Sequence, residues 1–215
     1  MKTALVSVLL MLIVSAPLAL AQERQFTDYE LQDPAYRLLS ELHRFGRRNN
    51  MLNVQPQDGR LLQMLVRMSG AKSVLEIGTS NGVSAIWMAL ALKQTGGRLT
   101  TLEIDSDRAK LARENFAKAG VADRIELVEG DAFQTLKTLT ATYDLLFIDA
   151  VKPEYKDYLD MIYSRIAKGG IIVAHNAVQS AALMRDYLDH VQNHPELDTV
   201  ILSTGSDGVA LSYKK

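Results

Sequence analysis

The feature that most constrains the fold is a regular alternation of short apolar runs with longer helix-forming stretches. Five runs are predicted to be strands, namely SVLEIG, RLTTLEI, RIELVEG, YDLLFIDA and GGIIVAHN. Their apolar residues are nearly continuous, which predicts burial on both faces. Helix-forming stretches lie between them, at Val83–Lys93, Asp107–Ala119, Ala132–Leu139 and Tyr155–Ala167. This order predicts an α/β fold in which helices cover both faces of a mostly parallel sheet.

The two ends of the chain add to this pattern. A helix near Ala181–Val191 precedes TVILST and GVALSY, which are separated by the turn-rich tetrapeptide Gly205–Gly208. This predicts an antiparallel hairpin at the C-terminal end of the sheet. Near the other end, Asp28–Gly46 is predicted to be an amphipathic helix interrupted near Pro34, and Gln57–Met68 a second helix. Together these residues, about 28–68, are expected to form a helical cover.

The first residues resemble an export signal. Lys2 precedes an apolar run from Ala4 to Leu20, and Ala19-Leu20-Ala21 gives the small-x-small pattern of a cleavage site. Residues 1–21 are therefore predicted to be a signal peptide that is cleaved before Gln22, which implies export, most simply to a bacterial periplasm. The alternative is an uncleaved membrane anchor. Residues 22–215 are too few for two ordinary domains and are predicted to form one.

Composition excludes several classes of function. Lysine and arginine number 24 against 25 acidic residues, and no long basic stretch is present, which speaks against nucleic-acid binding. There is no cysteine, which excludes disulfide scaffolds, thiolate metal sites and a cysteine nucleophile.

The first predicted strand ends in the glycine-bearing loop LEIGTSNGVSA. Gly78 and Gly82 let a backbone approach a ligand closely, and the following helix offers free amide groups. The spacing differs from the G-x-G-x-x-G of a nicotinamide-dependent oxidoreductase, and Glu76 would repel a pyrophosphate but attract an ammonium group. The alternative is that the glycines serve steric needs alone.

Two further strand ends carry acidic residues. Glu103 lies about 25 residues after Gly78, at the end of the second strand. At this position in nucleotide-binding folds, a carboxylate accepts hydrogen bonds from both hydroxyls of a ribose. Asp131 follows the third strand, where a carboxylate or a neighbouring amide could contact an adenine edge. Each acidic residue has the alternative of a solvated strand end, but three in register along one sheet edge favour a binding site.

The motifs VLEIGTSNGVSA, LEID, GDA and FIDAVKPEY resemble those of the class I S-adenosylmethionine (SAM)-dependent O-methyltransferases of the catechol and caffeoyl-CoA type. The resemblance extends to NMLNV and Gly59 before the first strand. It implies a Rossmann-like methyltransferase fold and methyl transfer from SAM to an oxygen of a small hydroxylated, phenolic acceptor. A homodimer is compatible with it.

The resemblance also implies a set of cofactor-binding residues. Asn53 and Val54 would lie beside the methionine end, Glu76 and Ser84 would hold its amino and carboxyl groups, and Glu103 would bind the ribose. The complete implied set is Asn53, Val54, Glu76, Gly78, Gly82, Ser84, Glu103, Asp131, Ala132 and Asp149.

In this family a divalent metal is held by an aspartate after the fourth strand and an Asp-Asn pair after the fifth. Asp149 and Asn176 match the outer ligands, whereas His175 stands where the family has aspartate. The change removes a negative charge and weakens retention of magnesium, while manganese, iron or zinc would tolerate the mixed ligands better. The alternative is a metal-free chain in which His175 and Asn176 close the strand end.

The implied catalytic residues are Lys152, Asp149 and His175. The lysine would remove the acceptor's proton, which requires a lowered pKa. Two departures weaken a catechol assignment: Val151 replaces a second acidic residue, and TVILST contains no carboxylate to orient a second hydroxyl. The rival prediction is an exported, non-catalytic binding module that retains the fold. After cleavage of the signal, no stable membrane association is expected.

Overall fold

The structure is a computed structural model that describes residues 26–49 and 51–215. One seven-stranded sheet has the strand order β3-β2-β1-β4-β5-β7-β6. Its strands are β1 (Ser73–Ile77), β2 (Arg98–Glu103), β3 (Ile125–Glu129), β4 (Tyr143–Ile148), β5 (Ile166–His175), β6 (Leu197–Leu202) and β7 (Val209–Lys214). Strands β1 to β5 run parallel, and β7 pairs antiparallel with β5 and β6. The predicted α/β fold with a C-terminal antiparallel hairpin is confirmed. The predicted signal peptide, residues 1–21, lies outside the described residues.

Seven α-helices surround this sheet in the part of the chain that the structure describes. They are α2 (Pro34–Arg48), α3 (Pro56–Ser69), α4 (Val83–Thr95), α5 (Ser106–Lys118), α6 (Ala132–Thr138), α7 (Tyr155–Ile162) and α8 (Arg185–Asn193). Short 3₁₀ helices are η1 (Glu30–Gln32), η2 (Ala122–Arg124), η3 (Lys152–Glu154) and η4 (Tyr163–Arg165). None of the helices in residues 26–49 and 51–215 is long and apolar enough to cross a membrane.

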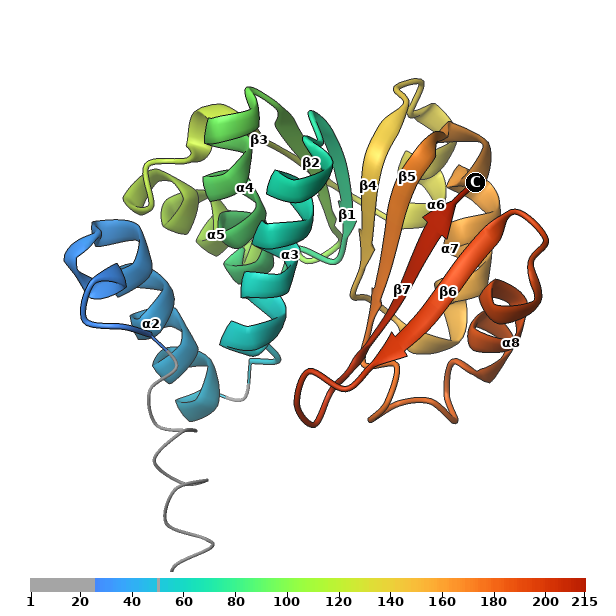
Figure 1. Cartoon of the computed structure of the whole chain (residues 1–215). Helices are drawn as coiled ribbons and strands as arrows, with labels where there is room; N and C mark the ends of the chain where they lie inside the picture. Colours follow the sequence, from blue (N-terminus) through green and yellow to red (C-terminus); the bar gives the residue numbers. More distant parts are fainter. Residues whose placement is uncertain (1–25, 50) are drawn as a thin grey trace, which may run out of the picture.

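Helices cover both faces of the sheet, with α2 to α5 on one side and α6 to α8 on the other (Figure 1). Neighbouring residues of one strand therefore enter opposite cores. In β4, Phe147 packs with the first group of helices and Leu146 with the second. This explains why the central strands are apolar at nearly every position.

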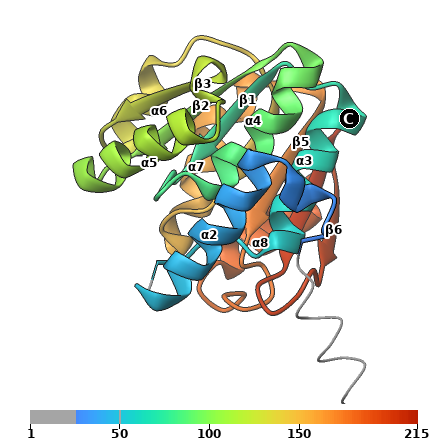
Figure 2. The same cartoon turned by 90° about the vertical axis from the view of Figure 1, so that its left-hand side faces the viewer.

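Close packing of α3 on α4 fixes the position of the N-terminal helices. A Cβ atom at Gly59 would lie 2.3 Å from the Trp87 ring, so the missing side chain is what allows α3 to approach α4. The Trp87 ring also stacks on Phe26, with 5.8 Å between the two ring centroids. As Figures 1 and 2 show, α2 and the turn between β6 and β7 lie at the same end of the molecule.

Three predicted details were wrong. The helix expected to extend from Tyr155 to Ala167 ends at Ile162, because Ile166 already pairs with Tyr143 of β4. The helix expected near Ala181 begins only at Arg185, after a series of turns. Strand β3 is partly exposed rather than buried on both faces, since it forms the edge of the sheet.

Candidate functional site

The predicted site residues lie along the edge of the sheet where β1 to β5 end. Since these strands are parallel and in register, with Ile77 opposite both Leu102 and Ile148, their carboxyl ends reach the same level. Predicted residues at or just after these ends are Glu76, Gly78, Glu103, Asp131, Ala132, Asp149, His175 and Asn176. The helical cover adds Asn53 and Val54, and the start of α4 adds Gly82 and Ser84.

The loop after β1 is shaped by two glycines. Gly78 and Gly82 have φ angles of 100° and 89°, which favour glycine. A Cβ atom at Gly78 would lie 2.1 Å from the carbonyl oxygen of Asp149, and one at Gly82 would lie 2.4 Å from the Phe116 ring. Both glycines thus have a steric role, and Gly78 also brings the loops after β1 and β4 into contact.

Glu76 is fully buried at the end of β1. Ser84 Oγ and Thr101 Oγ1 each donate a hydrogen bond of 2.5 Å to its carboxyl oxygens. Burial raises the pKa of Glu76 to about 8, because desolvation of the carboxylate outweighs these two hydrogen bonds. The carboxyl group is therefore mostly protonated at neutral pH and can become a carboxylate when a cation approaches.

Glu103 is held rigidly at the end of β2. Its carboxylate accepts hydrogen bonds from the backbone amides of Ser80, at 2.6 Å, and Asp105, at 3.0 Å. The amide of Gly130 bonds to the carbonyl of Glu103, which places the end of β3 beside it. Asp131 is exposed and caps α6 through the amide of Gln134, at 3.0 Å.

The segment containing Asn53 and Val54 lies beside the β1 loop. Asn81 Nδ2 is 3.8 Å from the sulfur of Met51, and Asn53 Nδ2 donates to the carbonyl of Leu42 at 3.1 Å. Asn53 Oδ1 and Asn81 Oδ1 are buried without a hydrogen-bond partner in the described part of the chain. Two buried acceptors without donors are costly unless a ligand supplies the donors.

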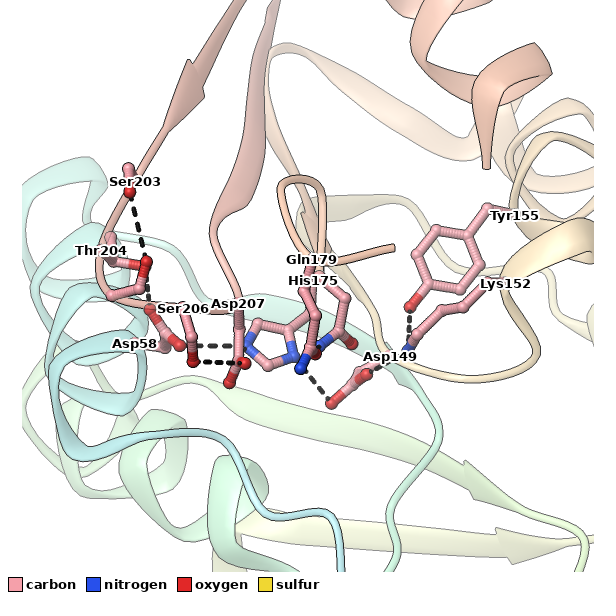
Figure 3. A network of polar contacts seen from close by, with 12 residues as sticks. Asp58, Asp149, Lys152, Tyr155, His175, Gln179, Ser203, Thr204, Ser206 and Asp207 are labelled. Carbon is pink, nitrogen blue, oxygen red and sulfur yellow. Dashed lines mark hydrogen bonds and ion pairs between the residues drawn. The ribbon is translucent and has the colours of Figure 1, made fainter. Parts of the chain in front are cut away.

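Asp149 and Lys152 form an ion pair after β4. Lys152 Nζ donates to Asp149 Oδ1 and to the hydroxyl of Tyr155, each at 2.8 Å (Figure 3). Burial would raise the pKa of Asp149, but the ring of His175 and the ammonium group of Lys152 outweigh burial and hold that pKa below its usual range. In this arrangement Lys152 is a hydrogen-bond donor.

His175 is buried, and carboxylates face both of its ring nitrogens. Nε2 lies 3.0 Å from Asp58 Oδ2 and 3.9 Å from Asp207 Oδ2, and Nδ1 lies 3.3 Å from Asp149 Oδ2. Nδ1 has no hydrogen-bond partner in the part of the chain that the structure describes. Burial lowers the pKa of His175, but Asp149 and Asp58 together raise it to about 10.

Sequence reasoning missed Asp58 and Asp207. Asp58 lies in the first turn of α3, and Asp207 lies in the turn between β6 and β7 (Figure 3). A signal for Asp58 was present: Asp58, Leu62 and Val66 follow the four-residue spacing of one helix face, and all three are buried. An acidic residue on a buried face requires a partner. The sequence held no comparable signal for Asp207.

Asn176, predicted either to bind a metal or to close the strand end, bonds to Gln179. It follows β5 with a φ angle of 61°, and its Nδ2 donates to Gln179 Oε1 at 3.2 Å. Among the described residues, Asp58, His175 and Asp207 form a cluster that could hold a metal ion. One candidate ligand atom from each lies within 4.8 Å of those of the other two.

Comparison with known proteins places this arrangement in a family. The profile of the O-methyltransferase family matches residues 30–203. The catechol O-methyltransferase of Mycobacterium tuberculosis is 37% identical over 175 residues, which are 74% of this chain and 79% of that protein.

Two solved structures are similar in fold. An O-methyltransferase from Bacillus cereus in complex with SAH, the demethylated product of SAM, has a TM-score of 0.75 and 29% identity, with 83% of this chain and 91% of that chain covered. The O-methyltransferase TomG from Streptomyces achromogenes, in complex with SAM, has a TM-score of 0.75 and 30% identity, covering 83% and 89% of the two chains. The chain therefore belongs to the family of SAM-dependent O-methyltransferases.

Proposed function

We propose that this chain transfers the methyl group of SAM to an oxygen of a small hydroxylated acceptor, most simply a phenol. The observation that carries the proposal is the row of polar groups along one sheet edge, from Glu103 through Glu76 to Asp149. The relatives named as catechol O-methyltransferases support the acceptor class. The rival, a non-catalytic binding module, has no support from the comparisons.

The residues at this edge suit the functional groups of SAM. Glu76 would meet the ammonium group, together with the buried acceptor oxygens of Asn53 and Asn81, which have no partner among the described residues. Ser84 Oγ would then turn towards the carboxylate group of SAM. Glu103, fixed by two backbone amides, would accept the ribose hydroxyls, and Asp131 with Ala132 would border the adenine.

When bound, SAM supplies a sulfonium methyl group: the acceptor oxygen forms a C–O bond as the C–S bond breaks, the electron pair stays on sulfur and the hydroxyl proton leaves. The protein contributes mainly alignment of the two reactants. Lys152 donates to Asp149 and Tyr155, and its third hydrogen is free to bind the acceptor oxygen. We therefore assign Lys152 a role in binding and stabilising the oxyanion, and the proton leaves to solvent.

The contacts do not fit the divalent metal that the resemblance implies. Asp149 Oδ1 pairs with the ammonium group of Lys152, and His175 Nε2 bonds to Asp58. Asn176, the third implied ligand, bonds to Gln179. No step of the proposed reaction is therefore assigned to a metal.

We also propose that the chain is exported, on the basis of Lys2, the apolar run that follows it and the Ala19-Leu20-Ala21 pattern. Fractionation of the bacterial host, followed by N-terminal sequencing, tests this. Export with cleavage predicts a chain that begins at Gln22 in the periplasmic fraction. A chain that keeps Met1 in the membrane fraction would instead show an uncleaved anchor.

The enzymatic proposal is tested with radiolabelled SAM and a panel of catechols and other phenols. The wild-type chain should transfer label to at least one of them and bind SAM and SAH in calorimetry. Glu103→Gln should weaken SAM binding about tenfold, the loss of roughly one charged hydrogen bond. Glu126→Gln is the matched control, since Glu126 is exposed on neighbouring β3. Absence of binding at millimolar concentration would refute the proposal.

A further inference from the structure

One face of helix α2 is exposed and rich in arginine. The buried residues of this helix, such as Leu39 and Leu42, follow the three- and four-residue spacing of one helix face. Arg37, Arg44 and Arg48 follow the same kind of spacing on the opposite face, and all three are exposed. Figure 2 shows α2 on the outside of the molecule, facing the viewer. The helix therefore presents a row of arginines to its surroundings.

These arginines are a local excess of positive charge in a chain that has no such excess overall. Residues 34–70 contain six arginines and two acidic residues, and one of the two, Asp58, is buried. The whole chain has a formal net charge of -1. Within residues 26–49 and 51–215, Arg44, Arg47 and Arg48 form no ion pair. Arginines without a counter-ion attract an anionic surface.

Two large exposed apolar side chains accompany the arginines. Phe45 follows Arg44 directly and is 43% exposed, and Leu52, in the loop that joins α2 to α3, is 88% exposed. Arginines next to exposed apolar side chains suit an anionic bilayer, because the guanidinium groups bind phosphates while the apolar groups enter the lipid. A nucleic acid or an acidic protein would use the arginines but would leave Leu52 in water. The combination therefore favours a lipid surface.

The N-terminal segment is joined to the molecule near this face. Phe26 stacks on Trp87, and the Trp87 ring lies against Gly59 in the first turns of α3. The loop that contains Leu52 leads directly into α3. The predicted export segment, which precedes Phe26 in sequence, is thus connected to the end of the molecule that carries the arginines. A chain that crosses a bilayer behind this segment emerges with the same end closest to the lipid.

The same loop borders the candidate site. Met51 precedes Leu52, and the Met51 sulfur lies 3.8 Å from Asn81 Nδ2 in the loop after β1. Asn53 follows Leu52 and bonds to the carbonyl of Leu42 in α2. A lipid contact at Leu52 would therefore place the candidate site next to the bilayer surface.

We propose that an arginine-rich face, formed by Arg44, Phe45, Arg47, Arg48 and Leu52, docks this chain reversibly on an anionic phospholipid bilayer. The three arginines bind headgroup phosphates, and the two apolar side chains enter the boundary between headgroups and acyl chains. This contact differs from the stable anchoring that an uncleaved N-terminal segment would give, because it depends on salt and on lipid charge. It does not depend on the binding of SAM.

The test is flotation of the chain with phospholipid vesicles. Both described cores consist of residues from Phe26 onwards, so a chain that begins at Gln22 keeps them and lacks the apolar run that would itself enter lipid. Vesicles with about one-third phosphatidylglycerol in phosphatidylcholine are compared with phosphatidylcholine alone. Each mixture is measured at about 0.05 M and about 0.5 M salt. Circular dichroism of every sample shows whether it is folded.

Two triple variants separate the local face from total charge. The first combines Arg44→Gln, Arg47→Gln and Arg48→Gln. The matched control combines Lys137→Gln, Lys168→Gln and Arg185→Gln, which removes the same charge from exposed side chains outside the arginine-rich face. A single variant, Leu52→Ser, tests the apolar contact.

The wild-type chain should bind phosphatidylglycerol vesicles at low salt, and binding should be lost at high salt or on phosphatidylcholine alone. Since each arginine contributes about fivefold, the first triple variant should bind about a hundredfold more weakly, while the control stays within about threefold of wild type. Leu52→Ser should weaken vesicle binding about tenfold and leave retention on immobilised heparin unchanged.

Three results would overturn the proposal. The first is a folded wild-type chain that does not bind phosphatidylglycerol vesicles at low salt. The second is equal loss of binding in the two triple variants, which would show that only total charge matters. The third is retention on heparin without vesicle binding, which would assign the arginine-rich face to an acidic macromolecule.

Discussion

Binding of SAM is expected to release a proton from Glu76. The carboxyl group is fully buried, and burial raises its pKa to about 8. In the proposed complex the ammonium group of SAM lies next to this side chain, and an adjacent cation favours the ionised form. The carboxyl group would therefore change from mostly protonated to ionised as the cofactor binds.

The size of the effect follows from the pKa. With a pKa of about 8, about 0.9 of the Glu76 side chains are protonated at pH 7, about 0.5 at pH 8 and about 0.1 at pH 9. Cofactor binding should release about these fractions of a proton. Ionising the group at pH 7 costs about 1.4 kcal/mol, so the affinity for SAM should rise about tenfold between pH 7 and pH 9 relative to that of Glu76→Gln.

Calorimetry in two buffers measures this release. The binding enthalpy at pH 7 should differ between phosphate and Tris by about 0.9 times the difference in their ionisation enthalpies. Glu76→Gln is the control, because it keeps the size of the side chain, removes its titration and leaves any proton exchange of the ligand unchanged. If the wild type binds SAM with the same proton release as Glu76→Gln, the proposed contact between Glu76 and the ammonium group is wrong.

Three further predictions concern stability and are measured by urea denaturation. Gly78→Ala should destabilise the fold by more than about 2 kcal/mol, because a Cβ atom would clash with the Asp149 carbonyl oxygen. Gly120→Ala, which is also at positive φ but has open space around it, should cost only about 1 kcal/mol. Equal costs would contradict the close contact of the loops after β1 and β4. Asp58→Asn should cost about 1–3 kcal/mol, because it replaces the carboxylate that bonds to the buried His175 Nε2, against less than about 0.5 kcal/mol for Asp123→Asn at an exposed side chain. Finally, the raised pKa of Glu76 means that its contribution to stability is complete below its ordinary pKa of 4.5 and is lost as pH rises through about 8. Between pH 6 and pH 8.5 the wild type should thus lose about 2–3 kcal/mol more than Glu76→Gln, and a parallel pH dependence of the two proteins would refute this.

Periodic features of the sequence predicted most of the fold. The strands were found because both faces of the sheet are covered, which leaves nearly continuous apolar runs such as LLFI in β4. The hairpin was found from its turn residues. The end of α7 was missed because the pairing of Ile166 with Tyr143 depends on a tertiary contact that overrides the local helix preference.

The candidate site was only partly predictable for a related reason. The carboxyl ends of neighbouring parallel strands lie at the same edge of a sheet. Glu76, Glu103 and Asp149 could therefore be placed together from sequence. Asp58 and His175 are 117 residues apart, and their contact depends on how α3 passes α4 at Gly59. No local pattern encodes that geometry, although an acidic residue on the buried face of a helix indicates that a partner exists.

The most direct test of the account is calorimetric titration of the chain with SAH, followed by methyl transfer from labelled SAM to a phenol. The account predicts saturable binding of one SAH per chain, binding weakened about tenfold by Glu103→Gln but not by Glu126→Gln, and labelled product. Failure of the wild-type chain to bind SAH at millimolar concentration would contradict it.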